Sequence, residues 1–282
     1  MMGKFKRIFW LWSQCFRSMK QPGTFVPFFL YAVFQLLILY SLMNFESEPF
    51  STLYIPLVQK IFGDAALHYP TFYYILVPFF NQINIILSGL VGVALIAVGT
   101  QLFAFSFNKE KSGIGDAIKS AMPKVLPLFV IWIIETTLTL LIMLGVPYLL
   151  KELLQISAAD WRANQIIELG SMLLAVLISS FFAFTTALIV LDNQKMFTSI
   201  AQTFTIFRKN AITTFFLMAV PTLLYFPISY LGKKSSLLIS KFSPEIMAML
   251  IGSGILITFV TSYFQIGSIT RFYLYLKEDR RR

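Results

Sequence analysis

VLPLFVIWIIETTLTLLIMLGVPYLL, residues 125–150, is the stretch that decides the fold. Its 26 residues carry a single charge, Glu135. As a helix rising ~1.5 Å per residue the stretch would be roughly 39 Å long, enough to cross a ~30 Å hydrocarbon core. Glu135 would lie ~15 Å beyond Lys124, close to the bilayer midplane. An ionisable side chain at that depth is costly, so it needs a partner or a function.

The composition of the whole chain agrees with a membrane protein. Of 282 residues, 57% are hydrophobic and 13% are charged, and the mean hydropathy is +0.74. A soluble domain has about one quarter charged residues, so the sequence indicates a polytopic membrane protein. No polar stretch is long enough for a second domain. We therefore expect one integral membrane domain over residues 1–282, and we expect the first apolar stretch to be retained because no small-residue cleavage site follows it.

Several classes of chemistry are disfavoured by the residue inventory. The single cysteine, Cys15, excludes an internal disulfide and a cysteine-based zinc site. The single histidine, His68, falls in a predicted outer loop, which leaves an intramembrane serine at Ser253 without a base. Phosphate-loop, dinucleotide and zinc-helix motifs are absent from the sequence. We expect no catalytic residue, cofactor, metal or nucleic-acid partner, and hence no enzyme.

Hydropathy predicts an all-α bundle of six transmembrane helices. The expected spans are residues 25–43, 71–107, 125–150, 171–191, 212–231 and 246–270. The fifth contains Pro221 and Pro227, so a bent or broken helix is expected there. A short interfacial helix is also expected over residues 56–67.

The second apolar run, residues 71–107, fits two descriptions. It is either one long helix kinked near Pro78, with Asn81, Gln82 and Asn84 marking its outer boundary, or two short spans. With one helix and a cytoplasmic N-terminus, 17 of the 23 basic residues lie inside; with two spans only 10 do. The positive-inside rule selects six spans with both termini cytoplasmic, although Lys233 and Lys234 then lie outside against the rule.

Three inner segments have amphipathic helical spacing: residues 1–24, 114–125 and 197–209. The first is basic and aromatic, as is typical of helices that lie on a membrane surface, whereas packing on another cytosolic element is the alternative. We predict that basic residues at the two termini contact the anionic inner leaflet, namely Lys4, Arg7, Arg17, Lys20, Arg280, Arg281 and Arg282.

These segments predict three pseudo-repeated units, each a surface helix followed by a transmembrane hairpin. Residues 25–29 (FVPFF) stand 100 positions before residues 125–129 (VLPLF), and on that offset Gln35 matches Glu135. Repeats often build transporters with a midplane site, but duplication of a structural hairpin explains the pattern equally well.

The second half of the chain carries Asp192-Asn193-Gln194-Lys195, then Ser199-Ile200, and Arg208-Lys209-Asn210 at the entry to the next span. Over residues 109–282 this arrangement resembles the six-span bacterial membrane region found beside some glycerophosphodiester phosphodiesterases. The resemblance implies a multi-pass protein of a bacterial cytoplasmic (inner) membrane. The enzyme activity of that group belongs to a separate soluble domain that this sequence lacks, so no catalytic residue carries over.

Polar side chains at similar depth form a candidate midplane cluster: Gln35, Glu135, Ser179, Ser180, Thr261 and Ser262. No lysine or arginine lies at that depth. We expect Glu135 to lie among helices, within reach of Gln35 or of a hydroxyl from the fourth or sixth span. It would then either join helices by hydrogen bonds or bind a proton, a cation or an amine in a wet cavity.

Three functions remain after these exclusions. The sequence favours a non-catalytic accessory or scaffold subunit that binds membrane lipids and other membrane subunits, because nothing specifies a substrate. The alternative is a carrier or lipid-handling protein with a midplane polar site around Glu135. An intramembrane enzyme has the least support.

Overall fold

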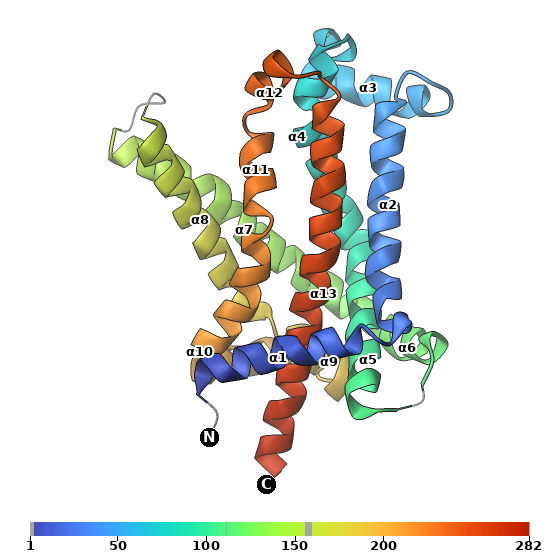
Figure 1. Cartoon of the computed structure of the whole chain (residues 1–282), viewed down its shortest axis with the longest axis vertical. Coiled ribbons are helices and arrows are strands. Elements are labelled where there is room, and N and C mark those ends of the chain that lie inside the picture. Colours follow the sequence, from blue (N-terminus) through green and yellow to red (C-terminus); the bar gives the residue numbers. More distant parts are fainter. Residues whose placement is uncertain (1–2, 111, 156–159, 282) are drawn as a thin grey trace. The chain divides into compact units, whose positions relative to one another are not determined.

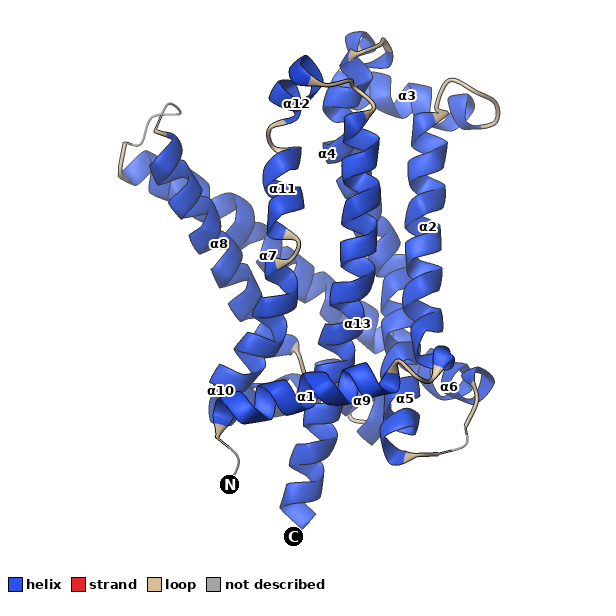
Figure 2. Ribbon diagram, viewed as in Figure 1, coloured by secondary structure: helices blue, strands red, loops and turns tan. Residues whose placement is uncertain are grey.

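The computed structural model describes residues 3–110, 112–155 and 160–281, without the side chains of Lys4, Trp161, Arg280 and Arg281. This part of the chain consists of helices joined by turns and loops, and it contains no strand (Figure 2). The all-α class predicted from hydropathy is therefore confirmed for the described residues.

The chain packs as two compact units, which we describe separately. Unit 1 comprises residues 1–26, 93–222 and 264–282, and unit 2 comprises residues 27–92 and 223–263. The boundaries fall inside helices, so that α13 (Ile246–Arg281) contributes its first half to unit 2 and its second half to unit 1.

Unit 1 contains the helical hairpin of α7 (Val125–Leu153) and α8 (Trp161–Phe182), which pack along each other (Figure 1). Asp160 caps the start of α8 by accepting a hydrogen bond from the Ala163 N–H at 3.1 Å. The remaining helices are α5 (Val93–Asn108), α6 (Ile114–Ala121), α9 (Thr185–Asp192) and α10 (Met196–Leu223). A non-helical residue, Asn210, divides α10 after its amphipathic first part.

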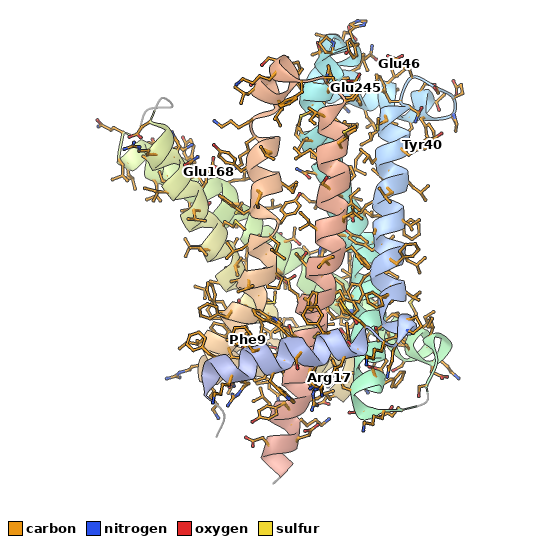
Figure 3. All side chains as sticks on the ribbon, in the orientation of Figure 1. Phe9, Arg17, Tyr40, Glu46, Glu168 and Glu245 are labelled. Carbon is orange, nitrogen blue, oxygen red and sulfur yellow. The ribbon has the colours of Figure 1, made fainter. Side chains whose placement is uncertain are left out.

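The N-terminal helix α1 (Lys4–Ser18) crosses the second half of α13 (Figure 1). Its buried face places Ile8 and Leu11 in a core with Phe272 of α13. Figure 3 shows Phe9 and Arg17 on opposite sides of α1, and both side chains are largely exposed. The helix therefore buries one apolar face and leaves an aromatic and a basic face uncovered, as an interfacial helix does.

Unit 2 contains α2 (Val26–Met43), α3 (Phe50–Phe62), α4 (Thr71–Leu87), α11 (Phe226–Gly232), α12 (Ser235–Lys241) and the first half of α13. One apolar core joins α2, α3, α4, α12 and the first half of α13. Fully buried Leu42, Leu76 and Met247 bring α2, α4 and α13 together, and Val58 adds α3. This packing is what holds the polar residues of unit 2 in fixed positions.

Among the described residues, five helical segments are long and apolar enough to cross a membrane, and the count is six if a bent pair forms one span. The five are Pro22–Met43, Thr71–Asn108, Ile114–Leu153, Arg162–Asp192 and Ile246–Asp279. The bent pair is α10 and α11, whose axes differ by 45°. The predicted break in the fifth span is confirmed, because Pro227 falls at the start of α11.

The helices differ from the predicted segments in four places. The long second helix is distorted at a π-helical turn over Ser88–Gly92, and not at Pro78, which lies inside α4. The interfacial helix α3 begins six residues earlier than expected, at Phe50, and includes Pro56. The fourth span begins ten residues earlier, at Trp161. The sixth helix continues to Arg281 because its second half packs against α1 and α9 in the core of unit 1.

Candidate functional site

A pair of amide side chains joins the first two long helices of unit 2. Gln35 of α2 donates from Nε2 to Asn84 Oδ1 of α4 at 2.8 Å, and the Tyr31 hydroxyl reaches the same oxygen at 3.2 Å. Gln35 is only 2% exposed. Side-chain amides inside an apolar bundle need such partners because no water is available to them.

One polar atom of this pair has no partner. Among the residues that the structure describes, no group hydrogen-bonds to Gln35 Oε1, although the atom is buried. A buried acceptor without a donor costs about 1–3 kcal/mol. Gln35 is also among the residues that line a cavity of unit 2.

The cavity has a volume of about 380 Å³ and lies entirely within unit 2. This volume is within the range of ~300–1,000 Å³ that is usual for small-molecule sites. It runs from Asn84 to Tyr74 of α4, ten residues or ~15 Å along the helix. Most of its wall is apolar and comes from α4, α11 and α13, including Val77, Pro78, Phe80, Ile228, Leu250, Ile251 and Ile255.

A broken helix forms one wall of the cavity. Tyr225 lies in the turn between α10 and α11, and Ile228 and Ser229 follow it on α11. Pro227 occupies the first turn of α11, a position at which proline is tolerated because its missing N–H would have no intrahelical partner. Gly254 allows α13 to approach this wall, because a Cβ there would lie 3.3 Å from the Ile228 side chain and 3.4 Å from the Tyr225 ring.

Charged residues occur near the end of unit 2 that is farther from Gln35. Lys233 and Ser235, which follow α11, belong to the cavity lining. Figure 3 shows Glu46 and Glu245 at one end of unit 2. Hydrogen bonds from its own backbone N–H and from Ser243 hold the pKa of the Glu245 carboxyl below its usual value, so this group is ionised at neutral pH.

A second polar pair joins the α7–α8 hairpin of unit 1. Glu135 of α7 hydrogen-bonds to Ser179 of α8, and both residues are half-buried. Ser179 belongs to the segment predicted as the fourth span, whose hydroxyls were expected within reach of Glu135. Glu135 is not among the residues that line the cavity of unit 2.

The other predicted cluster residues have local partners. The hydroxyls of Ser180 and Thr261 bond to carbonyls of their own helices, at Val176 and Thr258. Ser262 is half-buried on α13. Gln35, Thr261 and Ser262 belong to unit 2, whereas Glu135, Ser179 and Ser180 belong to unit 1.

Sequence reasoning did not include three polar residues, Asn81, Asn84 and Gln265, among the candidate site residues. Asn81 and Asn84 were predicted only as boundary markers, and both line the cavity from the first half of the helical segment Thr71–Asn108. Their spacing of three residues, which places them on one helix face, is the signal that would have identified them. Gln265 was also missed: its Nε2 donates to the Met218 carbonyl at 3.0 Å and to Thr222 at 2.8 Å, on either side of Pro221.

The residues predicted to contact anionic lipid have different surroundings. Arg17 and Lys20 are exposed. Arg7 is half-buried, and its guanidinium lies 5.4 Å above the Tyr275 ring of α13. The side chains of Lys4, Arg280 and Arg281, and all of Arg282, lie outside the described part of the structure.

Within the described ranges no three His, Cys, Asp or Glu side chains are grouped as a metal site would require. Comparison with known proteins finds no matching family model, no matching curated protein and no matching solved structure. The resemblance to the membrane region of the phosphodiesterase group therefore remains a prediction.

Proposed function

We propose that this protein is a multi-pass membrane protein that binds, and carries or presents, a small amphipathic molecule in the cavity of unit 2. The observation that carries the proposal is the cavity itself: a mostly apolar chamber whose lining includes the polar side chains of Gln35, Asn81 and Asn84. Such a combination of apolar walls and a few convergent polar groups is typical of ligand sites.

Two further features support a carrier rather than a purely structural bundle. Residues at the break between α10 and α11 line the cavity. Transporter sites are commonly formed where a transmembrane helix is discontinuous. The second helix supplies Asn81 and Asn84 to the same chamber, and polar side chains inside a membrane usually mark a substrate path. The site expected at Glu135 is thus proposed at Gln35 instead.

The proposed topology has six spans and both termini in the cytoplasm of a bacterial cell. Its support is the distribution of basic residues, 17 of 23 on the inner side, together with a second apolar run that is a single helical segment. In this topology the start of α12 faces outward, so the cavity would open toward the outer leaflet.

Native mass spectrometry after mild detergent extraction tests the function. Thr258 lines the cavity from α13, and Thr258→Phe should fill part of it, whereas Val260→Phe adds a ring to a position on α13 that is 40% exposed. We expect wild type and Val260→Phe to carry the same small-molecule adduct and Thr258→Phe to lose it. Equal adducts in all three proteins would place the bound molecule elsewhere.

A second function, an accessory subunit, is favoured by α7. Only 11% of the apolar window of the segment Ile114–Leu153 is buried, against 39% for Pro22–Met43. Leu141 and Leu144 on α7 are 62% and 71% exposed. A photo-crosslinking residue at position 144 should capture a protein neighbour in the native membrane if this face binds a subunit, and only lipid if it does not.

A further inference from the structure

The uncovered aromatic side of α1 forms a continuous row. Its members are spaced by three and four residues, which places side chains on one face of a helix, and we call them the aromatic stripe: Phe5, Phe9, Trp12 and Phe16. The three phenylalanine rings are 64%, 67% and 59% exposed. The stripe remains exposed although α1 has already buried its core face, which contains Ile8 and Leu11.

A second row on α1 is polar and basic. Lys6, Ser13 and Arg17 are spaced by seven and four residues, so they form one stripe, and all three are exposed. Lys20, just after the helix, is exposed as well. Phe9 of the aromatic stripe and Arg17 of this polar stripe lie on opposite sides of α1 (Figure 3).

Ring contacts within unit 1 give the direction that the aromatic stripe faces. The centroid of the Phe16 ring lies 4.7 Å from that of Phe264 on α13, and the Phe5 centroid lies 5.9 Å from that of Phe216 on α10. Phe264 belongs to the apolar part of α13, since residues 246–270 carry no charged side chain. The aromatic stripe therefore faces the part of α13 that is apolar enough to lie in a membrane.

The other side of α1 faces the charged end of α13. Trp10 follows Lys6 by four residues and so lies on the polar side of α1. Its ring centroid is 5.7 Å from that of Tyr275, and the Arg271 guanidinium lies 5.0 Å above its ring. The polar stripe is thus turned toward the end of α13 that carries the charges.

The crossing point of α1 coincides with a change of composition along α13. Six of the eleven residues 271–281 are charged, whereas none of residues 246–270 is. Phe264 and Tyr275 are eleven residues or ~16 Å apart along the helix, which leaves room for a helix of about 10–12 Å diameter between them. In a helix that spans a membrane, such a change from apolar to charged residues marks the membrane surface.

From these contacts we propose that α1 lies in the surface of a lipid leaflet that contains anionic lipids, with the aromatic stripe among the acyl chains and the polar stripe at the level of the phosphates. The proposal does not involve the cavity of unit 2. Burial of the rings among acyl chains removes apolar surface from water, and Lys6, Arg17 and Lys20 meet groups of opposite charge. A leaflet accounts for both stripes at once, because its apolar and anionic layers follow each other in the order of the stripes along α13.

Spin labels on single cysteines measure how deeply the two sides of α1 lie. Phe9→Cys and Arg17→Cys place a label on each stripe of the full-length protein in vesicles of phosphatidylcholine and phosphatidylglycerol, and the native Cys15 is fully buried. Collision rates with molecular oxygen, which concentrates among acyl chains, and with a water-soluble nickel complex give the depth of each label. We expect the label at position 9 to lie ~5–10 Å deeper than the label at position 17.

Equal depths, with both labels open to the nickel complex, would overturn the proposal. The vesicles contain no other protein, so a stripe that binds a protein partner would also stay open to the complex. Phe5→Cys, at a second exposed position of the aromatic stripe, gives the same comparison if Phe9→Cys does not fold.

The anionic lipid is tested from the polar stripe. A fluorophore is attached to Ser13→Cys, which keeps every basic residue, and bromine atoms that quench it are placed on the acyl chains of either the phosphatidylglycerol or the phosphatidylcholine in mixtures of the same composition. We expect brominated phosphatidylglycerol to quench at least about twofold more strongly, and Lys6→Gln with Arg17→Gln to remove the difference. Equal quenching with Lys6 and Arg17 intact would overturn the assignment of an anionic lipid.

Discussion

Two hairpins of this protein carry a polar residue at the same register, and they use it differently. Gln35 and Glu135 are 100 positions apart, and each bonds to the following long helix, at Asn84 and Ser179 respectively. In unit 2 the bonded pair lines a cavity of about 380 Å³. In unit 1 the pair lies between two helices that pack directly on each other.

Under the proposed function, predicted depth in the membrane alone does not identify the ligand site. Placing the Glu135 carboxyl inside a membrane costs more free energy than placing the Gln35 amide there, and the sequence analysis favoured Glu135 for that reason. Gln35 is nearly fully buried, and together with its partner Asn84 it belongs to the lining of the cavity. We therefore expect Glu135 to join α7 to α8 and Gln35 to contact a ligand.

The largest expected effect is a difference in thiol labelling between positions 233 and 119, which the proposed topology places on opposite sides of the membrane. We expect Lys233→Cys, at the rim of the cavity, to react with an impermeant thiol reagent added outside intact cells, and Lys119→Cys, before α7, to be protected. Permeabilised cells provide the control in which both react. Labelling of position 119 from outside would refute the topology.

The next effect separates ligand binding from helix packing. Gln35→Leu should reduce the amount of co-purified adduct roughly tenfold, because the hydrogen bond that positions Asn84 in the cavity lining is lost. Glu135→Leu should leave the adduct of the folded protein unchanged. Quantitative native mass spectrometry of the two variants checks this, and loss of the adduct in Glu135→Leu alone would reverse the two assignments.

A smaller effect is expected on the stability of the hairpin. Glu135→Leu should lower the free energy of unfolding in detergent by ~1–2 kcal/mol, whereas Glu135→Gln should preserve it because an amide can still bond to Ser179. In the double variant with Ser179→Ala the two losses should not add. Additive losses in chemical-denaturation curves would mean that the two side chains act independently.

The apolar periodicity of the sequence was sufficient for the helical class, the long second helix and the broken fifth span. These features depend on local properties of the chain, which a sequence pattern reveals. Pro227 acts on the helix backbone, and the apolar run around residue 135 acts through its length and hydrophobicity. The distortion at residues 88–92 was not predictable from Pro78, because its position follows from packing, including the approach of the Tyr31 ring to Gly92.

The site was less predictable than the fold because it depends on which helices become neighbours. Gln35 was selected from its depth, but its partner Asn84 was assigned to a boundary, since one sequence gives no information on inter-helix pairing. Lys233, which conflicts with the positive-inside rule, has a use in the proposed site because it belongs to the cavity lining.

The central claim is that the amide pair of unit 2 opens on an accessible chamber and that the Glu135–Ser179 pair of unit 1 does not. A comparison of two half-buried positions tests this claim. Ser229→Cys lies in the cavity wall, and Thr136→Cys lies beside Glu135 on α7. We expect a small water-soluble thiol reagent to modify the cysteine at position 229 at least about tenfold faster than the one at position 136, because thiol modification requires access of the reagent and of water. Equal rates at the two positions would contradict the account.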